Sequence, residues 1–322
     1  MAIKAWMRVL RITLTTKSPG QGGKNRQMVI KDNGDGIGLA ISVTGNKYMS
    51  TLKDCCTVKI ANLTYAEIIQ IISGQFYNIK IECGYKSSGI YTIFDGGIMY
   101  VSNLRESVDT NIVTILCASH LVSTWGQKRL NLSFNSGINL YSAINFVCKT
   151  GAVQNPNIST QFKKQFFNAI ENTNNKTAAE WINEQTIKKG SYITSSDCVG
   201  NSFLTMFDAA KSNARVIKLD NETLILTGGF PKLTTEGLVF SAMPTFAFQC
   251  GDVIEMDNSL IQLNINSQQT ATKNLGGLLD ENGQYMIYEI YYALENRGNN
   301  FYLEISAKTR SKISAYLAKE SN

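Results

Sequence analysis

The sequence predicts a mainly β protein in which two β-barrel domains are bridged by a helical α+β segment. Apolar residues alternate with a period of two through residues 1–122 and again through residues 240–322, as is typical of strands with one buried face. In residues 123–239 they recur at three- and four-residue steps, the period of amphipathic helices. These three ranges are the expected domains, and the last one ends in a polar tail.

The longest alternating run, residues 79–119, is expected to form four consecutive strands. They should begin at Ile79, Tyr91, Ile98 and Asn111. Asp95-Gly96-Gly97 is a tight-turn or bulge signal between the second and the third. Such a meander cannot stand alone and needs partner strands.

The elements before this meander complete the first expected barrel. Strands are predicted over residues 6–15, 37–43 and 56–63. The capping-box pair Thr64 and Glu67 then predicts a short helix, and Ile68, Ile69 and Ile72 are expected to form its buried face.

Four helices are predicted in the bridging segment. The expected helices are one capped by Ser136 with Ile138, Tyr141, Ile144 and Cys148 inside, one containing Phe162, Phe166 and Ile170, one opened by the Thr177–Glu180 capping box with Trp181 and Ile182 inside, and one containing Phe203, Phe207 and Ala210. A type I′ hairpin at Asp220-Asn221 should then join residues 215–219 to 223–227.

The last third of the chain is expected to form a second barrel. Its strands are predicted over residues 251–256, 261–265, 285–294 and 301–307. Both faces of Tyr285 to Tyr292 are apolar or aromatic, which indicates a strand covered on both sides. We expect the two barrels to be copies of one fold that form separate sheets.

Two sets of residues resemble the central hub proteins of the baseplates of contractile-tailed bacteriophages. The first barrel carries Asn62, Leu63, Gly84, Tyr85, Gly89, Phe94, Gly97, Arg105 and Asp109 in the order of that family. The last third carries Met243-Pro244, then Gly251-Asp252-Val253-Ile254, then Gly283-Gln284-Tyr285, and finally Asn296-Arg297-Gly298. These residues match a folding pattern, and none is a catalytic signature.

The resemblance implies two tube-like barrels per chain and a homotrimer that presents six similar positions around a DNA channel. It implies that the protein joins the tail tube to the central spike, contacts other baseplate proteins and lets phage DNA pass without sequence-specific binding. The expected location is the virion tail baseplate, after synthesis in the bacterial host cytoplasm. No catalytic, cofactor-binding or metal-binding residue is implied.

The residues themselves also argue against an enzyme. His120 is the only histidine, and its neighbour Ser119 would point to the opposite face of a strand. The glycine-rich loop at residues 18–24 lacks the spacing of a phosphate loop, and the loop at residues 32–36 lacks the ligands of a calcium loop. The alternative function is a spike-associated hydrolase or a carbohydrate-binding module built on β-barrels.

Composition sets further limits. The net charge of +6 is spread along the chain, and Lys163-Lys164 and Lys188-Lys189 are expected to be solvated helix faces. The seven cysteines include no C-x-x-C pair, so free thiols are expected, with Cys55 and Cys56 on opposite faces of a strand. The sequence shows no apolar run long enough for a membrane helix and no cleavage site of a secretion signal.

Overall fold

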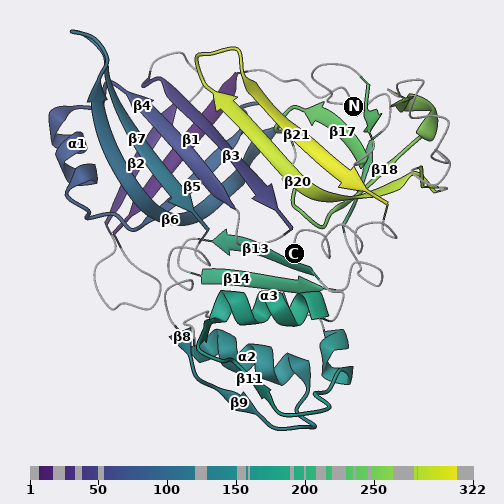
Figure 1. Ribbon diagram of the computed structural model, residues 1–322. Helices are drawn as coiled ribbons and strands as arrows, with labels where there is room; N and C mark the ends of the chain where they lie inside the picture. Colours follow the sequence, from purple (N-terminus) through teal and green to yellow (C-terminus); the bar gives the residue numbers. More distant parts are fainter. Residues whose placement is uncertain are drawn as a thin grey trace.

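The computed structural model describes residues 7–16, 26–32, 38–49, 54–119, 129–150, 157–158, 160–188, 192–198, 201–207, 215–219, 230–234, 237–245, 248–263, 279–280 and 282–309. The fold is mostly β, as predicted. A 14-stranded sheet dominates, and a lobe with helices and three small sheets lies beside it (Figure 1).

The first β unit comprises β1 to β7 and helix α1. Its strands are β1 (Arg8–Thr15), β2 (Gln27–Asp32), β3 (Ile41–Tyr48), β4 (Cys55–Ala61), β5 (Asn78–Tyr85), β6 (Gly89–Arg105) and β7 (Asn111–Ala118). They lie side by side in the order β2-β1-β5-β6-β7-β4-β3, with antiparallel neighbours throughout. The alternating residues of these strands point into one large apolar core.

The predicted four-strand meander is wrong in one respect, because the structure has three strands there. Asp95-Gly96-Gly97 lies inside β6, which pairs first with β5 and then with β7. A Cβ atom on Gly96 would lie 2.4 Å from the carbonyl oxygen of Ala118. The glycine therefore permits a close approach of two strands and makes no turn.

Helix α1 (Tyr65–Ile72) begins as predicted, at a capping box formed by Thr64 and Glu67. The predicted buried face is partly wrong. Ile68 and Ile71 are buried, whereas Ile69 and Ile72 are exposed. The helix contacts β6, and its sequence is apolar on both faces, so periodicity alone could not identify the inner one.

The middle lobe has its own apolar core. Its elements are β8 (Arg129–Leu130), β9 (Ser133–Phe134), α2 (Leu140–Thr150), β10 (Asn157–Ile158), η2 (Thr160–Lys164), β11 (Glu171–Asn172), β12 (Lys176–Thr177), α3 (Ala178–Lys188), β13 (Tyr192–Cys198) and β14 (Asn201–Phe207). The sheet of β13 and β14 lies between the helices of this lobe and the large sheet (Figure 1).

Two of the four predicted helices form in this lobe. In α3, Trp181 and Ile182 are buried as predicted, and the capping box at Thr177 is present. In α2, Ile144 and Cys148 are buried, but Asn139 accepts the capping hydrogen bond from the Ser142 N–H.

The other two helix predictions are wrong. Phe162 lies in the short 3₁₀ helix η2, and Phe166 and Ile170 are exposed beyond it. Residues 201–207, expected to be helical, form the strand β14 and pair with β13. Apolar residues four apart also lie on one face of a strand, so this spacing did not decide between the two structures.

The second β unit comprises β15 to β21. Its elements are β15 (Val216–Leu219), β16 (Lys232–Thr234), β17 (Gly237–Ala242), β18 (Val253–Met256), η3 (Asn258–Leu260), β19 (Gln262–Leu263), β20 (Gln284–Glu295) and β21 (Phe301–Lys308). The order β20-β21-β17-β16-β19 continues the large sheet, while β18 pairs with the start of β20 and with β15. Residues 223–227 of the predicted hairpin lie outside the described residues, and β15 pairs in parallel with β18.

The two β units do not form separate sheets, contrary to the sequence-based expectation. β3 of the first unit pairs with β20 of the second along Glu289–Glu295. Alternation predicted both strands correctly but carried no information on their partners. Pairing satisfies the backbone groups of two edge strands that would otherwise be open.

The strand order of the first unit recurs in the second. The series β6-β7-β4-β3 corresponds to β20-β21-β17-β16, and each neighbouring pair is antiparallel in both. Each long hairpin also carries one bulged residue, Met99 in β6 and Tyr288 in β20. These two residues lie equally far before the last paired residues of their strands, Arg105 and Leu294. The correspondence supports two copies of one β fold.

Candidate assembly surface

The junction between the two β units joins parts of the chain that are far apart in sequence. β3 and β20 pair antiparallel from Ser42↔Glu295 to Tyr48↔Glu289. Tyr285, Tyr288 and Tyr292 of β20 are all buried. The prediction that this strand is covered on both faces is therefore confirmed for most of its length, although Tyr291 is only partly buried.

The turn between β20 and β21 clasps the first unit. The side chain of Asn296 accepts a hydrogen bond from the Ile41 N–H at 2.8 Å and donates one to the Leu39 carbonyl at 2.8 Å. The Arg297 guanidinium donates to the carbonyl oxygen of Gly38. These bonds fix the register of the junction at one end.

A contact between the Arg8 guanidinium and the Phe301 ring lies at the same end of the junction. Arg8 of β1 lies over the ring of Phe301 at 5.2 Å and donates to the Gly298 carbonyl at 2.6 Å. Tyr85 packs edge-to-face on Phe301 with ring centroids 5.3 Å apart. The clasp thus joins β1, β5 and the β20–β21 turn.

The far side of the first unit has no such cover. Beyond Ile98, β6 pairs on one edge only within the described residues, and the strand on that edge is β7. Met99, Tyr100 and Leu104 along this stretch are exposed. We call Tyr100–Arg105 the open edge of β6. Among the described residues, the strand order of the large sheet itself ends at β2 and at the two-residue strand β19, which lies beside β16.

The family model for Baseplate hub gp41 matches residues 9–307. The chain belongs to this baseplate hub family. No curated protein sequence matches it.

Solved structures share the fold at low sequence identity. A 43 kDa tail protein of prophage MuSo2 from Shewanella oneidensis has a TM-score of 0.58 and 10% identity, with 94% of this chain and 98% of that chain covered. The E. coli c3393 protein, a type VI secretion component described as similar to the T4 tail proteins gp27 and gp5, has a TM-score of 0.54 and 9% identity, with 85% and 75% covered. A chain of the Francisella PdpA–VgrG complex has a TM-score of 0.52 and 8% identity, with 94% and 58% covered.

The chain is therefore a structural baseplate hub protein of phage-tail type, and its virion location is the tail. This hub spans a little over half of the chain that it matches in the Francisella PdpA–VgrG complex. Among the described residues, none of the helices combines the length and hydropathy that crossing a membrane requires.

Several residues that carried the family resemblance form hydrogen bonds that stabilise turns or the junction. Asn62 has a positive φ of 61° and exchanges hydrogen bonds with Asn111, its backbone N–H donating to the Asn111 carbonyl and its side chain accepting from the Asn111 N–H. Arg105 donates to the carbonyl oxygens of Ser107 and Val108 and so shapes the tip of the β6–β7 hairpin, where Asp109 also lies.

Two glycines among the residues that carried the family resemblance lie where a side chain would clash with a backbone carbonyl. Gly84 has a φ of +155°, and a Cβ atom there would lie 2.1 Å from the carbonyl oxygen of Gly89. Gly283 has a φ of +64°, and a Cβ atom there would lie 2.1 Å from the carbonyl oxygen of Met256. In the second unit Asp252 pairs with Arg215 and accepts from the Gln249 N–H, which holds the segment before β18.

The thiols of the hub lie mostly in its core. Cys55, Cys56, Cys83, Cys117, Cys148 and Cys250 are free in the structure, and the side chain of Cys198 lies outside the described residues. Cys55 is exposed and Cys56 is buried, as predicted for neighbours on a strand. Burial raises the pKa of Cys83 and of Cys148 to about 12. Such thiols stay protonated at neutral pH and are poor nucleophiles.

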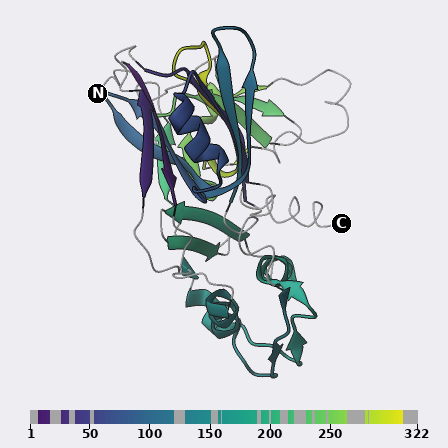
Figure 2. The ribbon, with the colours of Figure 1, turned by 90° about the vertical axis from the view of Figure 1, so that its left-hand side faces the viewer.

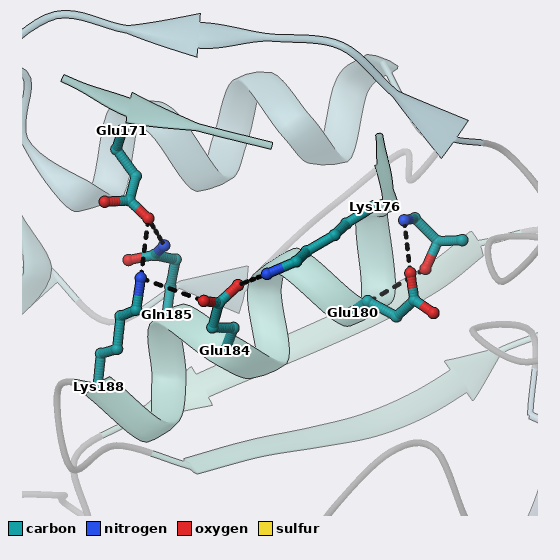
Figure 3. Close-up of polar contacts among 7 residues, drawn as sticks. Glu171, Lys176, Glu180, Glu184, Gln185 and Lys188 are labelled. Carbon is teal, nitrogen blue, oxygen red and sulfur yellow. Dashed lines mark hydrogen bonds and ion pairs between the residues drawn. The ribbon is translucent and has the colours of Figure 1, made fainter. Parts of the chain in front are cut away.

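The densest group of charged side chains lies on α3 in the middle lobe (Figure 3). It consists of Glu171, Lys176, Thr177, Glu180, Glu184, Gln185 and Lys188. Hydrogen bonds from the Thr177 backbone lower the pKa of Glu180, and the hydrogen bond from Lys176 lowers the pKa of Glu184. A general acid for glycoside hydrolysis needs the opposite, a raised pKa. This network joins α3 to β11 and β12, and Lys188 is exposed on its helix, as predicted, while pairing with Glu171 and Glu184.

The remaining candidate chemistry falls partly outside the described residues. Ser119 is buried, and its N–H donates to the Asp54 carbonyl. His120 and the two loops considered for phosphate and calcium lie mainly outside the described residues. Within the described residues, no group of three metal-ligating side chains comes together.

Proposed function

We propose that three copies of this hub close into a ring, in which each copy supplies two similar β units. The observation that supports the ring is the repeated strand order across the junction between β3 and β20. β16 corresponds to β3, and β6 corresponds to β20. The internal junction is thus a template for an external one, in which β16 or its neighbour β19 meets the open edge of β6 in the next copy.

Closure of the ring would cover the open edge of β6 and the β19 end of the large sheet. The contact is heterologous, since different surfaces of two copies meet, and such contacts form either a ring or an open filament. Three copies with two units each give six similar positions, which suits a junction between a sixfold tube and a threefold spike. The domain division proposed here is 1–122, 123–239 and 240–322, with β15 and β16 joining the sheet of the last domain.

The ring would connect the tail tube to the central spike, touch other baseplate proteins and let phage DNA pass without reading its sequence. The likeness to a chain of a VgrG complex and to a protein described as similar to gp27 and gp5 supports this placement. We propose synthesis in the bacterial host cytoplasm and no catalytic role. The lowered pKa values of Glu180 and Glu184 support a structural role for the main carboxylate group over a hydrolytic one.

Light scattering coupled to size-exclusion chromatography tests the ring. The expected mass of the purified chain is three times the 35.6 kDa of one copy, either alone or on addition of the cognate tube protein. A single copy under both conditions would contradict the ring. A sugar-binding module would instead stay monomeric and bind oligosaccharides in the same buffer.

A further inference from the structure

Helix α1 presents a second apolar face that the fold of a single copy does not cover. Tyr65, Ile69 and Ile72 follow one another at steps of four and three residues and are 78%, 47% and 45% exposed. We call these three residues the α1 stripe. The opposite face, with Ile68 and Ile71, is buried in the core. A helix that is apolar all round is normally buried on all sides.

Helix α1 lies on the side of the first β unit that faces away from the second unit (Figures 1 and 2). α1 contacts β6, whose bulged residue Met99 is also exposed. The only charged residue in α1 is Glu67, which is engaged with Thr64 in the capping box. An uncharged apolar surface of this kind suits a protein partner and does not suit the phosphates of DNA.

The repeat within the chain indicates what covers this surface. α1 connects β4 to β5, and residues 243–252 connect the corresponding strands β17 and β18. In this second connection Phe248 and Cys250 are buried, and the Cys250 thiol donates to the Lys47 carbonyl of β3 at 3.5 Å. The segment of the second unit that corresponds to α1 is therefore covered by the first unit, whose β3 pairs with β20.

The bulged residues give the same comparison independently. Tyr288 of β20 is 4% exposed, and its carbonyl accepts from the Met49 N–H just beyond β3. Its counterpart Met99 of β6 is 50% exposed. The bulged residue is thus buried in the second unit, where the first unit pairs with the strand, and exposed in the first unit, where no other unit does.

We propose that the α1 stripe packs against the β16–β19 end of a second copy of this chain. This inference rests on the proposed ring and adds a side-chain contact to its backbone pairing. The β16–β19 end offers an apolar partner, since Phe230 is exposed immediately before Pro231 and β16. The stripe, Met99 and the open edge of β6 then form one continuous subunit interface.

A pair of matched variants tests the contact. In Ile69→Glu with Ile72→Glu, two carboxylates replace exposed side chains of the stripe, so the fold should persist while the dissociation constant of the trimer rises about a hundredfold or more. The control Ile170→Glu changes a more exposed isoleucine of the middle lobe, 63% exposed, and should leave the trimer unchanged. Sedimentation velocity measures assembly, and circular dichroism with a thermal melt verifies folding.

The outcomes separate this contact from the ring itself. If the wild type is a monomer both alone and with the cognate tube protein, the proposed ring fails. If the wild type is a trimer and the folded double variant assembles with the same constant, the α1 stripe is not part of the interface. A double variant that fails to fold is replaced by Ile69→Ser, for which the expected weakening is about tenfold.

A photoreactive amino acid at position 69 identifies the occupant. Mixing copies with light and heavy isotopes distinguishes links between copies from links within one. Links between copies to residues 230–234 or 262–263 support the proposal. Links to α1 of another copy, or to a tube or spike protein only, overturn it.

Discussion

The two β units have the same strand order but differ in what covers them. In the second unit, β20 is paired along the edge that faces β3, and Ala293 is buried there. In the first unit the corresponding edge of β6 is open, and Leu104 at the position of Ala293 is exposed. The comparison indicates that the edge of this long strand is covered only when another β unit pairs with it. Within one copy, the first unit covers β20 in this way, and no unit covers β6.

The largest expected effect comes from crowding the internal junction at Gly45. A Cβ atom there would lie 2.4 Å from the Tyr292 hydroxyl oxygen and 2.5 Å from the Cys55 carbonyl oxygen. Gly45→Ala is therefore expected to lower the free energy of unfolding by about 3 kcal/mol or more, because both neighbours are held in the sheet. Chemical denaturation measures this loss. Thr44→Ala, on the neighbouring exposed residue, is the control, and equal stability of both variants would show that the junction can open.

A charge on β20 should have the next largest effect. Tyr288→Asp buries a carboxylate at the junction and is expected to cost several kcal/mol. Tyr291→Asp should cost about 1 kcal/mol, because Tyr291 is only partly buried and lies opposite Glu304. Both are compared with the wild type by thermal unfolding and light scattering. If Tyr288→Asp remains folded and oligomeric like the wild type, β20 is solvated and the template for the ring is wrong.

Alternation predicted the strands but not their partners. The period of two located β5, β7, β20 and β21, because each has one or two buried faces in the same core. It could not show that β3 meets β20, since pairing joins residues far apart in the chain. Gly96 and Asp95 were expected in a turn because their local signal is the same whether the chain turns or two strands approach closely.

The surface for assembly was the hardest feature to predict. Ile69 and Ile72 were assigned to the core because they are apolar, and only the structure shows that Ile71 occupies the inner face. The apolar character on both sides of α1 was nevertheless visible in the sequence. A short helix with more isoleucines than one face can hold is a signal of a partner. In β14, by contrast, a four-residue step was ambiguous between helix and strand.

A smaller effect is expected at the clasp. Arg8→Ala removes the hydrogen bond to the Gly298 carbonyl and the contact with the Phe301 ring, and should lower the free energy of unfolding by about 1–2 kcal/mol. Arg8→Lys keeps the charge and should lose less. Hydrogen exchange of the β20–β21 turn should increase in Arg8→Ala before exchange elsewhere. Unchanged protection of that turn would mean that Asn296 and Arg297 hold it without Arg8.

The smallest expected effect is the pH dependence of the middle lobe. The hydrogen bond from Lys176 lowers the pKa of Glu184 in the folded state. The ion pair therefore stabilises the fold fully above the ordinary glutamate pKa of about 4.3, and this stabilisation is lost as the pH falls through the lowered pKa of the folded state. The contribution should stay below about 1 kcal/mol, because both partners are partly exposed to solvent. The hydrogen-exchange protection factors of residues 178–188, which correct for the intrinsic slowing of amide exchange in acid, should therefore fall below about pH 4 in the wild type, with a weaker pH dependence in Lys176→Met. The control Lys163→Met changes a lysine that lies over the Tyr141 ring and should keep the wild-type dependence. Identical pH profiles in Lys176→Met and the wild type would show that the ion pair does not stabilise α3.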